Sequence, residues 1–395
     1  MLAHETKKEK MKLLFVTHKY PPSIGGMENH CYELYNGISG KIDTVMMRLP
    51  DGASRVWWLL TLAKRIKRTL QSDNTITHVY FHDGLSGLCC RSIKKYSQVK
   101  TIVTFHGLDV VYPNGLYQKR IQDNLKNNID IIIPVSTATG VECIKRGASP
   151  KKIHVVPNGV DLALDNIRLD KTFLSRLEER IHVPLKDKKI IVSTGRSITR
   201  KGFSWFINNV LPSLDNNVIY IMAGPREKGL SWKLFLMNIL PKSISRQIWL
   251  TGVGIDQAKI DKAIKRADLK GRVFHLGKLP LDELVQLLKS SYAFVMPNIH
   301  IDGDAEGFGL VGLEAAICGT VVLASEIEGI TEAIQNNKNG ILIEGENIDA
   351  WIKAVNSICK SPAKRKKIAY QAPIYTKNKF SWAKMARGYL KAFKS

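Results

Sequence analysis

The stretch Glu306-Gly-Phe-Gly-Leu-Val-Gly-Leu-Glu314-Ala-Ala decides how this chain is to be read. It follows a short apolar run, Ala293–Met296, and a loop, and the residues from Phe308 to Ile317 have the pattern of a helix start. Gly307 and Gly309 let the backbone approach a ligand without a side-chain clash. The first N–H groups of such a helix point outward, where phosphate binds well. The stretch therefore predicts a strand, loop and helix that hold a phosphate group.

Two glutamates at the ends of this stretch suit a sugar nucleotide. Glu314 lies in the first turns of the predicted helix, where its carboxylate can accept hydrogen bonds from ribose hydroxyls. Glu306 precedes the helix and could meet a sugar. We therefore expect one loop and one helix to bind ribose, pyrophosphate and sugar together. The expected ligand-binding residues of this unit are Glu306, Gly307, Phe308, Gly309, Leu310, Val311 and Glu314.

Short apolar runs alternate with helical patterns along the rest of the chain. Continuous apolar runs are typical of strands buried on both faces of a parallel sheet, and their alternation with helices predicts a doubly wound α/β architecture. The polar stretch 160–189 separates two such series, which indicates two Rossmann-like domains. The expected strands include residues 12–17, 101–105, 131–135, 189–193, 218–223, 293–296 and 320–324.

Length and charge bound the class of protein. The 395 residues suit two domains, and 44% hydrophobic with 24% charged residues indicates a folded chain. No apolar run approaches the roughly 20 residues of a spanning helix, and residues 1–10 lack the apolar core of a secretory signal. Six scattered cysteines predict free thiols in a reducing cytoplasm.

A net charge of +24 attracts anions, which include nucleic acid, acidic lipid and phosphorylated substrates. No module with base-stacking aromatics in a basic face is visible, so an anionic membrane surface is the preferred partner. Two basic, tryptophan-bearing segments, Arg55–Leu70 and Ser231–Leu250, have amphipathic patterns. Each pattern fits a membrane interface, and each fits equally a helix that packs its apolar face on its own domain.

Taken together, the motifs resemble the signature of family 4 retaining glycosyltransferases, which have the GT-B fold. The pair of glutamates around Gly-Phe-Gly is the most specific of them. The other motifs occur in the family's order: Pro21-Pro-Ser-Ile-Gly-Gly-Met-Glu28, His106-Gly-Leu-Asp109, Val155-Val-Pro-Asn-Gly-Val-Asp161, Gly195-Arg196 with Lys201-Gly202, Ala223-Gly-Pro225, Leu276-Gly277 and Glu328-Gly-Ile-Thr-Glu332. The resemblance covers residues 12 to 343. It departs from the family in a longer link, residues 226–272, for which the family pattern gives no role.

The resemblance implies a role for each matching residue. His106 and Glu306 are expected to contact the transferred sugar, and Glu314 to bind the ribose. Arg196 and Lys201 are expected to neutralise the diphosphate, with Gly25 and Gly26 closing over the donor or acceptor. Asp109 is expected to orient its loop or the acceptor, Asn158 to lie near the nucleotide or in a turn, and the backbone of residues 276–278 to meet the base.

The resemblance also implies a domain plan and a reaction. Residues 1–165 would bind the acceptor, residues 166–375 the nucleotide sugar, and residues 376–395 would form a helix that crosses back onto the first domain. The donor is expected to be a UDP-sugar, transferred with retention of configuration to a lipid-linked or cell-surface saccharide at the cytoplasmic membrane face. The basic pair would replace a metal ion, so no metal is expected at Asp302-Gly-Asp304, which is interpreted as part of the loop. The alternatives are a soluble acceptor, a non-catalytic scaffold, and a nucleic-acid-binding or nucleic-acid-modifying protein suggested by charge alone.

Overall fold

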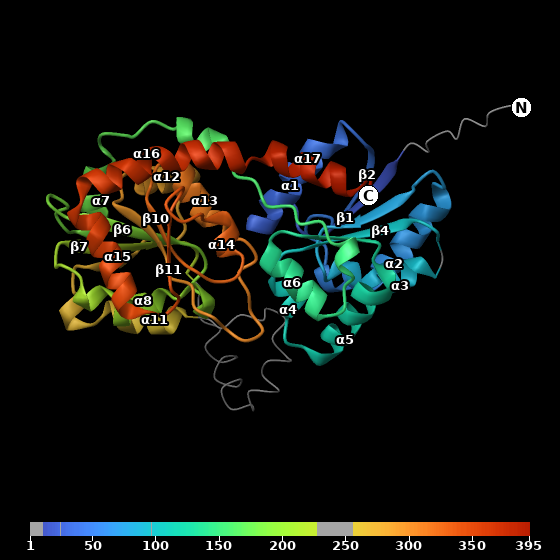
Figure 1. The fold of residues 1–395 in the computed structure, drawn as a ribbon, viewed down its shortest axis with the longest axis horizontal. Coiled ribbons are helices and arrows are strands. Elements are labelled where there is room, and N and C mark those ends of the chain that lie inside the picture. Colours follow the sequence, from blue (N-terminus) through green and yellow to red (C-terminus); the bar gives the residue numbers. More distant parts are fainter. Residues whose placement is uncertain (1–10, 24, 96, 227–255) are drawn as a thin grey trace, which may run out of the picture.

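The computed structural model describes residues 11–23, 25–95, 97–226 and 256–395. Two units lie side by side, each a parallel sheet with helices on both faces (Figure 1). This arrangement confirms the predicted α/β class and the two Rossmann-like domains. The second tryptophan-bearing segment, 231–250, lies outside the described residues.

The N-terminal unit contains a five-stranded parallel sheet in the order β2-β1-β3-β4-β5. Its strands are β1 (Lys12–Thr17), β2 (Asp43–Arg48), β3 (His78–Phe81), β4 (Lys100–Phe105) and β5 (Ile131–Pro134). Its helices are α1 (Gly26–Ser39), α2 (Arg55–Ser72), α3 (Cys90–Lys94), α4 (Leu108–Val111), α5 (Gly115–Asp123) and α6 (Thr137–Lys145).

The C-terminal unit contains a six-stranded parallel sheet in the order β11-β10-β9-β6-β7-β8. Its strands are β6 (Lys189–Thr194), β7 (Val218–Ala223), β8 (Val273–His275), β9 (Ala293–Met296), β10 (Val322–Ser325) and β11 (Ile341–Ile343). Its described helices are α7 (Phe173–Ile181), α8 (Phe203–Asn209), α11 (Gln257–Ile264), α12 (Leu281–Lys289), α13 (Leu310–Ile317), α14 (Ile330–Ala333), α15 (Ile348–Lys360) and α16 (Pro362–Lys379).

The chain crosses between the units twice, and the two crossings touch. The first is the segment 157–161, and the second lies between α16 and α17 (Trp382–Ala392). A Cβ on Gly159 would stand 2.4 Å from the backbone nitrogen of Trp382, so only a glycine fits there. Both connections therefore run through one narrow place, where a hinge between the units would lie.

The last helix, α17, belongs to the core of the N-terminal unit and lies beside α1 (Figure 1). Tyr389 and Phe393 are fully buried against the same sheet face as Leu13 and Phe15. Since α16 continues to Lys379, the chain leaves the C-terminal unit a few residues after the expected boundary at 376.

The α2 helix packs one side on its own domain and leaves other apolar side chains exposed, so both interpretations of its amphipathic pattern apply to part of it. Trp58, Leu62 and Ile66 are buried in the N-terminal core, as expected for a helix that packs on its own domain. Trp57 and Leu60 remain 69% and 71% exposed.

All six cysteines are free and five of them are buried, which agrees with the predicted thiols. None of the described helices is long and apolar enough to cross a membrane.

Candidate active site

The predicted phosphate-binding turn forms at the carboxyl edge of the C-terminal sheet. After β9 the chain makes a loop and enters α13 directly from Gly309, whose φ of 89° lies in the left-handed region that glycine adopts without strain. The first turn of α13 then presents N–H groups that have no acceptor within the helix. These groups and the helix dipole make the start of α13 suitable for an anion.

Glu306 is held by cations just before this turn. Its Oε2 accepts hydrogen bonds from Lys201 Nζ at 2.6 Å and from Asn298 Nδ2 at 3.0 Å, and it forms an ion pair with Arg200. Burial alone raises the pKa of this carboxyl, but the charges of Arg200 and Lys201 outweigh it and lower the pKa to about 2. Among the described residues no hydrogen bond reaches Oε1, so that oxygen is the one open to a sugar hydroxyl.

Arg200 is a member of this cluster that the motif search did not single out. Its guanidinium is buried and pairs with Asp304 at 3.0 Å as well as with Glu306. Its position directly before Lys201 is the one feature of the sequence that could have indicated a place in this cluster. The pairing also shows where the two carboxylates of Asp302-Gly-Asp304 lie. Asp304 is engaged by Arg200 in an ion pair, while Asp302 lies exposed at the surface beside His300.

Glu328 is a second residue whose role only the structure reveals. Its carboxylate accepts a hydrogen bond from the backbone N–H of Glu306, and it lies in a left-handed conformation with φ of 48°. A non-glycine residue adopts this conformation at a cost, which is tolerated where the surroundings fix it. Glu328 thus holds the backbone of the loop on which Glu306 lies.

Arg196 and Lys201 come from the same strand end, as expected. Both follow β6, and the charge of Arg196 contributes to the electrostatics of Lys201. Burial lowers the pKa of Lys201, and the neighbouring arginines lower it further against the opposing effect of Glu306. Arg196 itself is exposed. One cation is therefore fixed in the loop cluster and the other is free to meet a ligand from solvent.

Glu314 faces a cavity of about 320 Å³ between the two units. This volume is at the lower end of the range for small-molecule sites. Burial raises the pKa of Glu314 to about 7, with a further rise from the charge of Asp161 and an opposing effect of Lys201. The lining comes from α1, the hinge and α13 and includes Asn29, Tyr32, Glu33, Asp161, Leu310 and Trp382.

The N-terminal glycine loop lies against this cavity. Gly25 precedes α1, and a Cβ on Gly26 would stand 3.2 Å from Leu310 Cδ1 at the start of α13. The two glycines are therefore next to the predicted phosphate-binding turn. Phe308 is buried in the C-terminal core and stacks edge-on against Phe380, so its side chain supports the turn.

His106 lies at the end of β4, directly opposite the Glu306 loop. Gly107 pairs with Glu306 in an antiparallel bridge, and a Cβ on Gly307 would stand 1.8 Å from the carbonyl oxygen of His106. The Asp109 carboxylate accepts hydrogen bonds from the backbone N–H groups of His106 and Gly84, at 2.8 and 2.9 Å. Asp109 thus orients the loop, which was one of its two expected roles.

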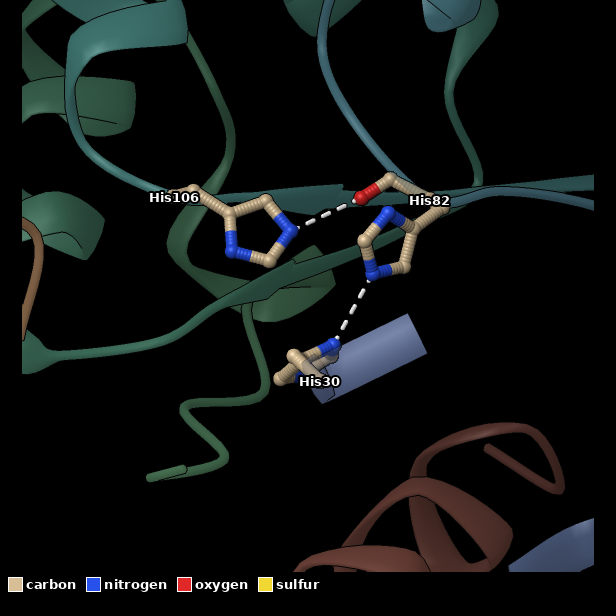
Figure 2. Close-up of side chains that lie close together, drawn as sticks. All are labelled: His30, His82 and His106. Carbon is tan, nitrogen blue, oxygen red and sulfur yellow. Dashed lines mark hydrogen bonds between the residues drawn. The ribbon is translucent and has the colours of Figure 1, made fainter. Parts of the chain in front are cut away.

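Three histidines surround the inner side of this loop (Figure 2). His30, His82 and His106 are the group of described side chains whose donor atoms lie close enough together to hold a metal ion, within 4.8 Å of one another. Several of their ring nitrogens already have partners, however. His30 Nδ1 faces His82 Nε2 at 2.9 Å, and His106 Nε2 faces the carbonyl oxygen of His82 at 2.9 Å.

Two further expectations concern the nucleotide. Asn158 is buried in the first crossing, and its Oδ1 has no hydrogen-bond partner among the described residues. Leu276 lines a second cavity, of about 290 Å³, together with Arg180, Arg226 and His275. The expected base contact at residues 276–278 therefore borders a hollow, at the sheet edge that also carries Arg196.

Comparison with known proteins supplies the family. A model described as glycosyl transferases group 1 matches residues 175–374, which is half of the chain, and one described as glycosyltransferase family 4 matches residues 40–164. The chain belongs to the glycosyl transferases group 1. It is a family 4 glycosyltransferase with the GT-B fold, as the motifs predicted.

Individual relatives are distant from this glycosyltransferase. An uncharacterised glycosyltransferase of Methanocaldococcus jannaschii is 23% identical over 97% of this chain and 98% of its own length. A D-inositol 3-phosphate glycosyltransferase of Rhodococcus jostii is 32% identical over 63% of this chain and 48% of its own. The crystal structure of Anabaena HepE in complex with UDP superimposes with a TM-score of 0.76 at 17% identity, covering 97% of this chain and all of HepE.

Proposed function

We propose that this glycosyltransferase takes a sugar from a UDP-linked donor and transfers it, with retention of anomeric configuration and without a metal ion, to a lipid-linked or cell-surface saccharide. The observation that carries the donor site is the position of the Glu306 cluster beside the first turn of α13. Helix N–H groups, Lys201 and Arg196 together offer positive charge where a diphosphate would lie. Glu314 would bind ribose hydroxyls in the adjacent cavity.

Bond cleavage at the anomeric carbon leaves positive charge on the sugar and negative charge on the diphosphate. Arg196, Lys201 and the start of α13 would stabilise the departing diphosphate. The acceptor oxygen would form its new bond to the anomeric carbon on the face from which the diphosphate leaves. Its proton would pass to a diphosphate oxygen, so that the step balances without a protein base.

Attack on the leaving group's face is favoured over a covalent intermediate on Glu306. The carboxylate is held by Arg200 and Lys201, and their charges lower its pKa to about 2. A carboxylate stabilised in this way is a poor nucleophile. Glu306 would instead place the sugar, opposite His106 across the seam between the units.

The exposed turn of α2 supports contact with an anionic membrane. We define it as Val56, Trp57 and Leu60, which are 58%, 69% and 71% exposed. The rest of α2 carries Arg55, Lys64, Arg65, Lys67 and Arg68 and no acidic residue. Tryptophan with basic neighbours suits the headgroup region of anionic lipid. Because α2 follows the carboxyl end of β2, this turn lies at the sheet edge where the site residues also lie.

The membrane proposal is tested with anionic vesicles. The double variant Trp57→Ala/Leu60→Ala should lose most of the binding, whereas Leu281→Ala/Tyr370→Ala, which removes exposed apolar groups from the other unit, should keep it. A protein that ignores vesicles and transfers sugar to a soluble hydroxyl compound would instead support the soluble-acceptor alternative. The transfer itself is tested with UDP-sugars in EDTA, and the anomeric configuration of the product is read by NMR.

A further inference from the structure

Two sets of hydrogen bonds, joined through the residue His82, connect His106 with the last helix of the protein. The hydroxyl of Tyr389, on α17, lies 3.2 Å from His30 Nε2 and 3.1 Å from Thr104 Oγ1. His30 Nδ1 meets His82 Nε2, and the backbone carbonyl of His82 meets the ring of His106 (Figure 2). His106 and Tyr389, which lie far apart in the sequence, are thus joined through one polar network.

The contact with the His82 carbonyl fixes the tautomer of His106. A carbonyl oxygen can only accept, so His106 Nε2 must carry the proton at its distance of 2.9 Å. In the neutral ring Nδ1 is then a bare acceptor, and Figure 2 shows it pointing away from His82. His106 consequently offers an acceptor on its open side, which suits a hydroxyl that donates.

The directions of the other bonds follow from one unpaired atom. His82 Nδ1 is buried and has no hydrogen-bond partner among the described residues. A buried N–H without a partner is rarer and costs more than a bare acceptor, so the proton of His82 belongs on Nε2. His82 then donates to His30 Nδ1, His30 donates through Nε2 to the Tyr389 oxygen, and the Tyr389 hydroxyl is free to donate to Thr104.

The surroundings keep His30, His82 and Tyr389 neutral. His30 and His82 are fully buried, and burial lowers the pKa of both well below the ordinary value. Burial also raises the pKa of Tyr389. With His30, His82 and Tyr389 neutral, these contacts are satisfied by a single proton arrangement, which makes the network a rigid support.

We propose that His82, His30 and Tyr389 are positioning residues: the ring contacts of His30 and Tyr389 fix His82, and the His82 backbone carbonyl holds His106 as its Nε2-protonated tautomer, with Nδ1 presented to the transferred sugar. This inference rests on the proposed function for the role of His106. In this proposal α17 does more than pack on the N-terminal sheet, because its Tyr389 supplies the hydroxyl that contacts His30. A hinge opening between the two units that displaced α17 would then also change the position of His106, through Tyr389.

The test compares two variants that each remove one hydroxyl from the same buried cluster. Tyr389→Phe deletes the oxygen that accepts from His30, while its ring keeps the packing against Phe393. Tyr80→Phe deletes a hydroxyl that contacts Thr104 at 2.8 Å and makes no hydrogen bond to a histidine among the described residues. The whole chain is labelled with ¹⁵N-histidine, and ring tautomers are read by long-range ¹⁵N–¹H NMR without substrate, with assignments from His→Gln variants.

The expected spectra at pH 8 show protonated Nε2 and bare Nδ1 for all three histidines, unchanged in Tyr80→Phe. In Tyr389→Phe we expect the His30 signals to become mixed and kcat to fall by about tenfold at unchanged donor KM, since a slight misplacement of a contacting group is costly. A proton on His106 Nδ1, equal behaviour of the two variants, or conversion of all three rings to a metal-bound pattern by one equivalent of Zn²⁺ would overturn the proposal. Failure of the proposed function would appear separately, as absent transfer with these tautomers intact.

Discussion

Replacing Glu314 with glutamine should make the free protein more stable and its nucleotide binding weaker. Glu314 is partly buried beside the cavity, and burial raises its pKa from 4.5 to about 7. The folded state therefore holds this proton more tightly than the unfolded chain does. Below pH 4.5 the residue is protonated in both states and contributes nothing. Between pH 4.5 and 7 the folded state loses stability, and above pH 7 the full penalty remains.

The size of this penalty follows from the same numbers. A rise from 4.5 to about 7 corresponds to about 3 kcal/mol, at 1.36 kcal/mol for each tenfold change in proton affinity. Because the carboxyl borders a cavity that admits solvent, we discount this to about 1–2 kcal/mol. Glu314→Gln removes the charge without changing the shape, so the free energy of unfolding at pH 8 should rise by that amount.

Urea unfolding at pH 4 and pH 8 measures the effect. Glu179→Gln is the matched control, since Glu179 lies exposed on α7 and makes the same change in charge. The control should alter stability by less than about 0.5 kcal/mol at both pH values. For nucleotide binding, loss of hydrogen bonds from ribose to a carboxylate should weaken Glu314→Gln by about tenfold or more. Equal destabilisation of Glu314→Gln at both pH values, with unchanged nucleotide affinity, would refute the reasoning.

The remaining predictions concern the cation cluster and the metal. Glu306→Gln should lower kcat by about 100-fold and destabilise the fold by about 3 kcal/mol, because it leaves Arg200 and Lys201 with one acidic partner fewer. An unchanged kcat together with an unchanged free energy of unfolding in urea would show that these ion pairs have no such role. Arg200→Met should destabilise the fold by a similar amount, since Asp304 then loses its partner, and an unchanged melting temperature would argue against that pairing. Transfer should continue in EDTA, and full dependence on added Mn²⁺ or Mg²⁺ would show that the basic pair does not replace a metal.

The fold was largely predictable because its strands are continuous apolar runs. The strands β6, β7 and β9 are buried along nearly their whole length and carry a local signal in the sequence. The placement of α17 had no comparable signal within its own residues, because its contacts with Leu13 and Phe15 lie far away along the chain. That expectation came from the resemblance and not from the pattern.

The candidate site was predictable only in part. The turn before α13 is local, so Gly309 and Glu314 could be interpreted from spacing alone. The pairing of Glu306 with Arg200, and the support of its backbone by Glu328, depend on which loops meet at the carboxyl edges of different strands. The histidine chain was hidden for the same reason, since His30 and His82 come from different elements and neither lies in a motif with an assigned role.

The central claim is that the Glu306 cluster and the start of α13 bind the diphosphate of a nucleotide sugar. It is tested most directly by calorimetric titration of UDP, GDP and ADP, without divalent metal, into the wild-type protein and into Arg196→Ala/Lys201→Ala. The account predicts micromolar-range binding of UDP by the wild type and a loss of about tenfold or more in the double variant. Equal affinity in the two proteins, or no binding of any nucleotide or UDP-sugar even with anionic vesicles present, would contradict it.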